Sequence, residues 1–401
     1  MKQILHETDS LLEQPTTQID PLFLEENMKN TILLAFSFIL VLSSSLLGQQ
    51  KVFTTEDGIR YRVETVLENL EIPWSLAFDD DGNMYFTERP GRLQLLKKGE
   101  KKPLLIASIK EVRHRGEGGL MGLALHPNFK INGFLYVSYT FDFRRGQSNK
   151  VVRFRLENGT LNDQKEILQY LPGSSVHNGC RLRFGPDGKL YITTGDAAER
   201  SIAQDLGSLG GKILRVNDDG SIPGDNPNPQ SPVFAFGFRN PQGIDWHPIS
   251  RVLFETEHGP SGFDGPGGGD EVNIVEPGKN YGWPIIHHRE TRSGMESPFL
   301  EYTPAIAPAS GVFYKGTVFP GFNTNYFFGG LRGQRIQRLV VTEQPPHRLI
   351  QQEVMLQGVF RRIREVTTGP DGYIYFSTSN RDGRATPVEN DDRILRIVPA
   401  Q

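Results

Sequence analysis

The chain has 401 residues, of which 37% are hydrophobic and 23% charged, so it can bury a sizeable core and is not disordered over most of its length. A formal net charge of −3 provides no strong electrostatic attraction to nucleic acid or to an anionic membrane. We therefore expect neither nucleic-acid binding nor stable membrane insertion. With 43 Gly, 27 Pro, 25 Phe and 12 Tyr, the composition is typical of an all-β protein with many turns.

The first distinctive element is an apolar run at residues 32–47, shorter than the roughly 20 residues that a membrane-spanning helix needs. It follows the basic Lys29 and leads through serines to Gly48. A basic start, an apolar centre and a small-residue exit predict an export signal at residues 28–49, and hence a periplasmic or secreted protein. A short buried helix is the alternative.

The residues ahead of this signal carry several acidic side chains, which do not suit the start of an export signal. We therefore interpret residues 1–27 as an upstream extension and Met28, rather than Met1, as the start. Residues 50–401 are left as the folded domain. Its single cysteine, Cys180, excludes an intrachain disulfide.

From residue 50 onwards one phrase returns six times: an apolar strand, a turn with Pro, Asp or Gly, and a second strand rich in Tyr, Phe and Thr. The copies cover residues 74–87, 122–139, 181–194, 243–256, 311–328 and 366–378. Third strands carrying basic residues follow several of them, at residues 150–155, 212–216, 335–339 and 393–397. Such β-meanders, in units of roughly 40 to 65 residues, predict an all-β, six-bladed β-propeller of four-stranded antiparallel blades.

Two further features refine this fold. Residues 53–66 form a spare β-rich stretch ahead of the first copy, which predicts a strand added to the last blade that closes the ring. Asp-Gly pairs at Asp81, Asp187 and Asp371 recur at equivalent hairpins, so we interpret them as turn residues rather than as catalytic carboxylates.

Segments that do not repeat are the candidates for function, because a propeller binds ligands on loops around its central channel. They are residues 115–120, 174–181, 237–243, 257–273, 280–284 and 360–365. Most of them lead into the first strand of a blade, where the chain reaches the axial face. We therefore expect several to converge.

The chemistry of these segments indicates an anionic ligand. They and their neighbours offer one histidine, His177, and a Gly-rich loop with bare carbonyls. They also offer four guanidiniums that can bind carboxylates or phosphates, those of Arg239, Arg332, Arg362 and Arg364. His177 is either a general base or a structural histidine. The last two arginines could equally lie on a solvated strand face.

At these residues the sequence resembles the glucose/sorbosone dehydrogenase family, the soluble quinoprotein sugar dehydrogenases, from about Pro73 onwards. The phrases that carry the resemblance are GEGGLMGLALHP (116–127), HNGCRLRF (177–184), GFRNPQG (237–243) and NYGWP (280–284).

The resemblance implies two cofactors, pyrroloquinoline quinone (PQQ) and Ca²⁺, and a set of residues that hold them. His177 falls at the family's general base, and Arg239 and Asn240 match the pair beside the reactive quinone carbonyl. The backbone carbonyls of Gly259 and Pro260 match the calcium ligands. The remaining cofactor-binding positions are Glu117, where the family has Gln, and Arg332, Arg362 and Arg364, which face the cofactor's carboxylates.

The implied reaction oxidises the anomeric carbon of an aldose to a lactone by hydride transfer to the quinone, with an external quinone or cytochrome as final electron acceptor. Val176 before the base, Glu117 and a short loop after Asp196 depart from the glucose dehydrogenases and point to the broader aldose sugar branch. Two alternatives stay open. One is a calcium-dependent lactonase, and the other is a recognition propeller that has lost its cofactor.

Overall fold

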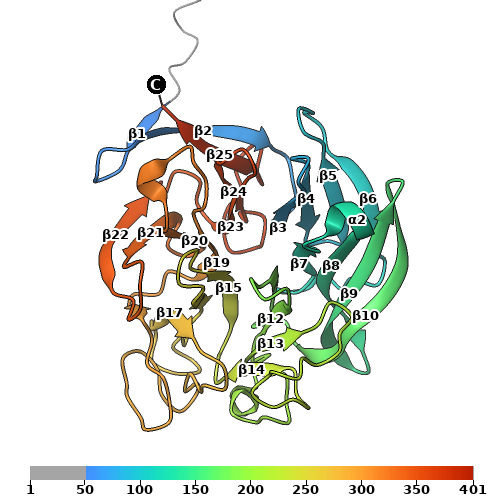
Figure 1. Cartoon of the computed structure of the whole chain (residues 1–401), viewed down its shortest axis with the longest axis vertical. Helices are drawn as coiled ribbons and strands as arrows, with labels where there is room; N and C mark the ends of the chain where they lie inside the picture. The colour runs from blue at the N-terminus through green and yellow to red at the C-terminus, as the bar shows by residue number, and fades with distance from the viewer. Residues whose placement is uncertain (1–50, 401) are drawn as a thin grey trace, which may run out of the picture. The chain divides into compact units, whose positions relative to one another are not determined.

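The computed structural model describes residues 51–400, which form six antiparallel sheets around a central axis (Figure 1). Blade 1 contains β3 (Pro73–Phe78), β4 (Met84–Glu88), β5 (Arg92–Leu96) and β6 (Leu104–Ser108). Blade 2 contains β7 (Leu120–Leu125), β8 (Phe134–Phe143), β9 (Gly146–Glu157) and β10 (Thr160–Gly173), and blade 3 contains β11 (Gly179–Phe184), β12 (Leu190–Thr194), β13 (Lys212–Val216) and β14 (Val233–Phe236).

The second half of the ring repeats this plan. Blade 4 contains β15 (Pro241–Trp246), β16 (Leu253–Glu257), β17 (Asp270–Val275) and β18 (Leu300–Tyr302), and blade 5 contains β19 (Pro308–Phe313), β20 (Tyr326–Gly330), β21 (Arg335–Val341) and β22 (Leu349–Met355). Blade 6 contains β23 (Ile363–Thr368), β24 (Ile374–Thr378) and β25 (Ile394–Pro399), together with β1 (Val52–Thr54) and β2 (Arg60–Leu67). The predicted six-bladed propeller is confirmed, and all six sequence copies fall on the first two strands of a blade.

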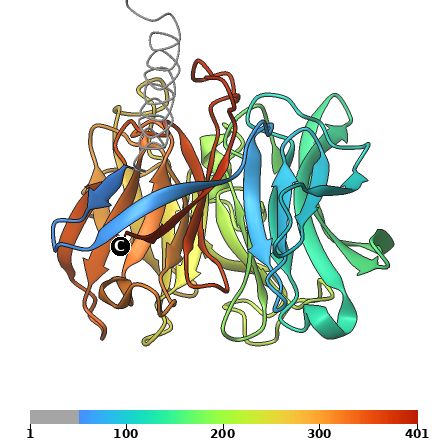
Figure 2. The same cartoon turned by 90° about the horizontal axis from the view of Figure 1, so that it is seen from above.

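The first strand of every blade is its innermost strand, and the six inner strands neighbour one another around the axis. Each blade is an antiparallel meander, so the segment leading into its first strand and the loop between its second and third strands lie at the same face. Figure 2 shows the strands running between two loop-bearing faces. One of these faces therefore gathers two loops from every blade.

The ring is closed by strands from opposite ends of the domain. β2 pairs with β25, and both views show blue β2 along the red end of the chain (Figures 1 and 2). This confirms the strand predicted at residues 53–66. The structure adds the short β1 outside β2, so blade 6 has five strands instead of four.

The core consists of six apolar clusters, one between each pair of neighbouring blades. Both faces of each sheet are covered, and for this reason central strands such as β4 and β24 are buried at every position. A seventh, smaller cluster of Trp74, Met121 and Cys180 lies on inner strands at the axis, and its first two members line the cavity described below.

The Asp-Gly turns are structural, as predicted. Asp81, Asp187 and Asp371 each lie between the first and second strands of a blade, and the glycine after each has a φ between +72° and +87°. Only glycine adopts this conformation at low cost. The Asp187 carboxylate accepts a hydrogen bond from the Lys189 amide at 3.1 Å, which is turn chemistry.

Helices are short in the described part of the chain: α2 (Phe129–Asn132), η1 (Arg200–Ala203) and η2 (Pro320–Phe322). Within residues 51–400, no helix has the length and apolar character required to span a membrane. The predicted upstream extension at 1–27 and export signal at 28–49 lie outside the described residues.

Candidate active site

A cavity of about 490 Å³ opens at the axial face where the loops gather. Six residues that the sequence analysis selected contribute to its wall: Glu117, Gly259, Pro260, Arg332, Arg362 and Arg364. The other three, His177, Arg239 and Asn240, are almost fully buried around it, next to the lining residues Asn178, Gly179 and His258. Segments that are up to about 250 residues apart thus meet at one site, because each lies at the start of a blade's first strand or in the loop after its second strand.

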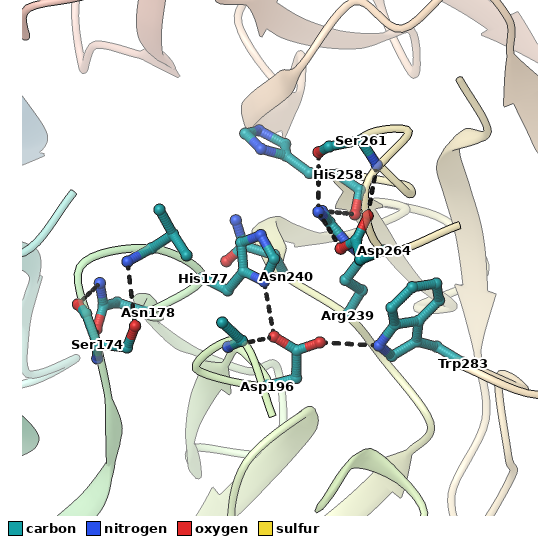
Figure 3. Close-up of polar contacts among 12 residues, drawn as sticks. Ser174, His177, Asn178, Asp196, Arg239, Asn240, His258, Ser261, Asp264 and Trp283 are labelled. Atoms are coloured by element: carbon teal, nitrogen blue, oxygen red, sulfur yellow. Dashed lines mark hydrogen bonds and ion pairs between the residues drawn. The ribbon is translucent and has the colours of Figure 1, made fainter. Parts of the chain in front are cut away.

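His177 immediately precedes β11 and is held by a buried carboxylate (Figure 3). Its Nδ1 lies 2.7 Å from Oδ1 of Asp196, and its Nε2 has no hydrogen-bond partner among residues 51–400. The carboxylate accepts a hydrogen bond from Nδ1–H, so in the neutral ring Nε2 is the nitrogen that can accept a proton. This is the arrangement of an oriented general base.

Asp196 is itself fixed on both of its oxygens. The Ala198 amide donates to Oδ1 at 2.8 Å, and the Trp283 indole Nε1 donates to Oδ2 at 2.9 Å (Figure 3). Three donors thus converge on a carboxylate with no solvent exposure, which fixes its position and orientation. The sequence analysis noted the loop after Asp196 but missed this function, because nothing in the local sequence links the residue to His177.

The main chain of His177 is also tightly constrained. Its φ is +54°, in the left-handed region that costs a non-glycine residue free energy. Its amide donates to Oε2 of Glu117 at 2.9 Å, and its carbonyl accepts from the Ala197 amide at 3.1 Å. Gly195 leaves room for that carbonyl, since a Cβ there would lie 2.0 Å from the carbonyl oxygen.

The arginines form an incompletely neutralised cationic wall. Arg362 binds Oδ2 of Asp382 through Nε at 2.9 Å and Nη2 at 2.7 Å, whereas Arg364 donates only to the Gln242 amide oxygen at 2.9 Å. Nε of Arg364 is buried without a partner in the described chain. Burial, together with neighbouring Arg362, lowers the pKa of Arg364 to about 9. A bound anion would relieve this charge.

Arg332 and Trp74 also line the cavity. Arg332 is exposed and makes no hydrogen bond or ion pair with residues 51–400, so its guanidinium is available to a ligand. Trp74 is buried, with Arg364 5.6 Å from its ring. In the sequence, Trp74 is the first residue of the first repeat, and no local signal marks it as an aromatic residue of the cavity.

Arg239 and Asn240 are buried beside the cavity rather than on its wall. All three guanidinium nitrogens of Arg239 contact the protein: Asp264 at 2.7 and 2.8 Å, the Ser261 hydroxyl at 2.9 Å and the His258 carbonyl at 3.1 Å (Figure 3). Arg239 therefore anchors the loop after β16. The Asn240 Oδ1 is engaged, but its Nδ2 is buried without a partner in residues 51–400.

The same loop offers backbone oxygens. No donor within the described chain hydrogen-bonds the carbonyls of Gly259 or Pro260, and both residues line the cavity. The Gly259 amide donates to Asp270 at 2.9 Å, which fixes the backbone. Oxygen ligands of this kind suit Ca²⁺. Residues 51–400 contain no cluster of three or more His, Cys, Asp or Glu side chains suited to a metal.

The fold and the site together define the class: a six-bladed propeller with an arginine-rich axial cavity, two free backbone carbonyls and a histidine oriented by a carboxylate. The family model for Glucose / Sorbosone dehydrogenase matches residues 70–390. The chain belongs to this family.

Individual relatives cover most of the domain. Aldose sugar dehydrogenase YliI of Escherichia coli (strain K12) is 32% identical over 350 residues, which cover 81% of this chain and 92% of that protein. The PQQ-bound form of aldose sugar dehydrogenase from Streptomyces coelicolor has a TM-score of 0.76 and 30% identity, covering 84% of this chain and 98% of that one. Hedgehog-interacting protein of Mus musculus is 31% identical over 355 residues, covering 75% of this chain and 48% of that protein.

Proposed function

We propose that the protein is a PQQ-dependent aldose sugar dehydrogenase that oxidises the anomeric carbon of aldoses to lactones and passes the electrons to an external quinone or cytochrome. The observation that carries the proposal is the pairing of two features at one cavity. Beside the cavity, Asp196 holds Nδ1 of His177, whose Nε2 has no partner within residues 51–400. The cavity wall carries arginines, and one of them, Arg364, has a buried donor without a partner in the same residues.

The donor set fits a cofactor with three carboxylates and a calcium ion. Arg332, Arg362 and Arg364 supply the cations, and the buried, unpartnered Nε of Arg364 requires an acceptor that the described protein does not provide. Nδ2 of Asn240, which is also buried without a partner in residues 51–400, requires a second hydrogen-bond acceptor. The carbonyls of Gly259 and Pro260 are the free oxygens that a calcium ion would use.

His177, Asp196 and Arg239 have different roles in the proposed reaction. When bound, PQQ supplies the two-electron acceptor and Ca²⁺ a Lewis acid. His177 accepts the proton of the sugar's anomeric hydroxyl at Nε2. Asp196 keeps the other ring nitrogen protonated and stabilises the imidazolium that forms. Arg239 acts by holding the loop that carries the calcium-binding carbonyls.

Reconstitution tests the proposal. Protein treated with a chelator should reduce an artificial electron-accepting dye with aldoses only after PQQ and Ca²⁺ are both added, because two neutral carbonyls bind calcium weakly without further oxygens. Absorbance spectra taken during the titration report cofactor binding separately. Aldose oxidation with a nicotinamide cofactor, or with neither addition, would contradict the proposal.

The same experiment decides between the alternatives. A recognition propeller would bind neither PQQ nor sugar productively, and the relative named Hedgehog-interacting protein is the reason to include this outcome. A calcium-dependent lactonase would hydrolyse lactones with Ca²⁺ alone. Hydrolysis of that kind needs several carboxylates around one metal.

A further inference from the structure

An ion pair crosses the mouth of the cavity between two distant loops. Nη1 of Arg384 lies 2.7 Å from Oε1 of Glu117. Arg384 belongs to the loop between β24 and β25 of blade 6, whereas Glu117 precedes β7 of blade 2. Both residues line the cavity, and the Arg384 side chain is 52% exposed against 19% for Glu117.

Glu117 connects this ion pair to the histidine. Its Oε2 accepts the main-chain amide of His177 at 2.9 Å, while its own amide donates to the Ser175 carbonyl at 2.8 Å. Gly116 permits that close approach, because a Cβ at this position would lie 2.2 Å from the Ser175 oxygen. The two segments are therefore locked together, and the carboxylate bridges a surface guanidinium to the backbone of His177.

The backbone at His177 needs such a restraint. With φ at +54°, it occupies a conformation that surrounding contacts must impose. Of those contacts, the Glu117 carboxylate is the one that depends on a charge at the cavity mouth. Burial tends to raise the pKa of Glu117, but Arg384, His258 and the His177 amide outweigh burial and hold the pKa below its ordinary value.

We propose that Arg384 is a positioning residue that acts through Glu117: it fixes the carboxylate that holds the main chain of His177 in the orientation needed for proton abstraction. The catalytic part of this inference rests on the proposed function. The structural part, a chain of contacts from Arg384 through Glu117 to the His177 amide, does not.

The first test measures the amide directly in the full chain purified without added cofactor. Hydrogen–deuterium exchange by mass spectrometry, with fragmentation that resolves residues 176–179, should show the His177 amide exchanging about tenfold faster in Arg384→Met than in wild type, because a charge-assisted hydrogen bond is weakened. Arg384→Lys should restore most of the protection. Arg361→Met is the matched control, since Arg361 contacts the same loop at the Thr386 carbonyl and does not contact Glu117.

The second test is a double-mutant cycle with Glu117→Gln. Gln retains an oxygen acceptor for the His177 amide but has no charge that could form an ion pair with Arg384. In the Glu117→Gln background, Arg384→Met should therefore raise the exchange rate of the His177 amide by less than about twofold. In the holoenzyme, Arg384→Met should lower kcat about tenfold and change PQQ affinity and sugar KM less than about twofold.

Each outcome decides. Unchanged amide exchange in Arg384→Met, or equal effects of this substitution with and without Glu117→Gln, would overturn the inference. A fall in PQQ affinity with normal amide protection would also overturn it, and would make Arg384 a cofactor-binding residue. If wild type neither binds PQQ nor oxidises sugars, the proposed function fails, while the exchange experiment still decides the contact chain.

Discussion

Single residues in the cavity separate proton transfer from cofactor binding. Nδ1 of His177 contacts Asp196, whereas its Nε2 has no partner within residues 51–400, and we propose that Nε2 accepts the proton of the substrate. Arg364, by contrast, is buried, its Nε has no partner within residues 51–400, and burial lowers its pKa to about 9. Substitutions at the two positions should therefore fail in different ways.

We predict that His177→Ala binds PQQ and Ca²⁺ with near-normal affinity while turnover falls by about 10² to 10⁴, the usual loss for a general base. Arg364→Ala should lose about ten- to a hundredfold in PQQ affinity, and excess PQQ should restore part of its activity. PQQ titrations followed by steady-state kinetics measure both quantities. Wild-type turnover in His177→Ala at saturating PQQ would show that the base assignment is wrong.

At the scale of elements, blade 4 combines a functional loop with an unusual sheet. The β16–β17 hairpin carries the loop with Gly259 and Pro260, and its strands bury two carboxylates that share one amide donor. Nδ2 of Asn273 donates to Glu255 at 3.1 Å and to Glu271 at 3.2 Å. Burial raises the pKa of Glu271 to about 8 and that of Glu255 well above its usual value.

A raised carboxylate pKa in the folded state links stability to pH. Between the ordinary value of 4.5 and about 8, folded Glu271 binds a proton that the unfolded chain has released. Its contribution to the free energy of unfolding is thus fully present below pH 4.5 and is lost as the pH rises through 8. We predict that in Glu271→Gln the free energy of unfolding decreases less between pH 4.5 and 8 than it does in wild type.

Urea unfolding of chelated protein between pH 5 and 8.5 tests this prediction, with the slope of stability against pH compared between variants. Glu276→Gln, at an exposed position just after β17, is the control and should follow wild type. An identical slope in wild type and Glu271→Gln would show that Glu271 is ionised in the folded protein.

For the whole molecule, stability depends on closing the ring with a strand from the far end of the sequence. Tyr61 on β2 is 3% exposed, stacks on Phe53 at 5.5 Å and belongs to the apolar cluster between blades 5 and 6. It therefore joins the N-terminal strands of the domain to both blades.

We predict that Tyr61→Ala lowers the free energy of unfolding by about 3 kcal/mol, the cost of deleting a large buried ring. Val52→Ala, at an exposed position on β1, should change it by less than about 0.5 kcal/mol. Tryptophan fluorescence during urea unfolding measures both changes. Equal stability of the two variants would mean that the closing strand contributes little to the ring.

Export is a prediction for the whole chain that lies outside the described residues. The basic start, short apolar run and small-residue exit at residues 28–49 lead us to expect cleavage near Gly48 to Gln50. N-terminal sequencing of protein recovered from the periplasm or medium should begin there. An intact apolar segment on the exported protein would contradict the assignment.

The sequence by itself determined the propeller, because its signals are short-range. Period-2 strands, the Asp-Gly turns at Asp81, Asp187 and Asp371, and the spare strand at residues 53–66 can each be read within a few residues. The segments that do not repeat then indicated His177 and the arginines, and the family resemblance assigned their roles. The fifth strand of blade 6 escaped notice because β1 has only three residues and no periodic pattern.

Tertiary structure alone decided which side chains pair. His177 is held by Asp196, 19 positions later, and by Glu117, 60 positions earlier, while the partner of Glu117 is Arg384 on another blade. Likewise, the contact of Arg239 with Asp264 anchors the loop after β16, and this pairing is not predicted from the sequence. Such pairings follow from ring closure and strand register, which bring separate loops to one axis, and no local pattern in the sequence encodes those distances.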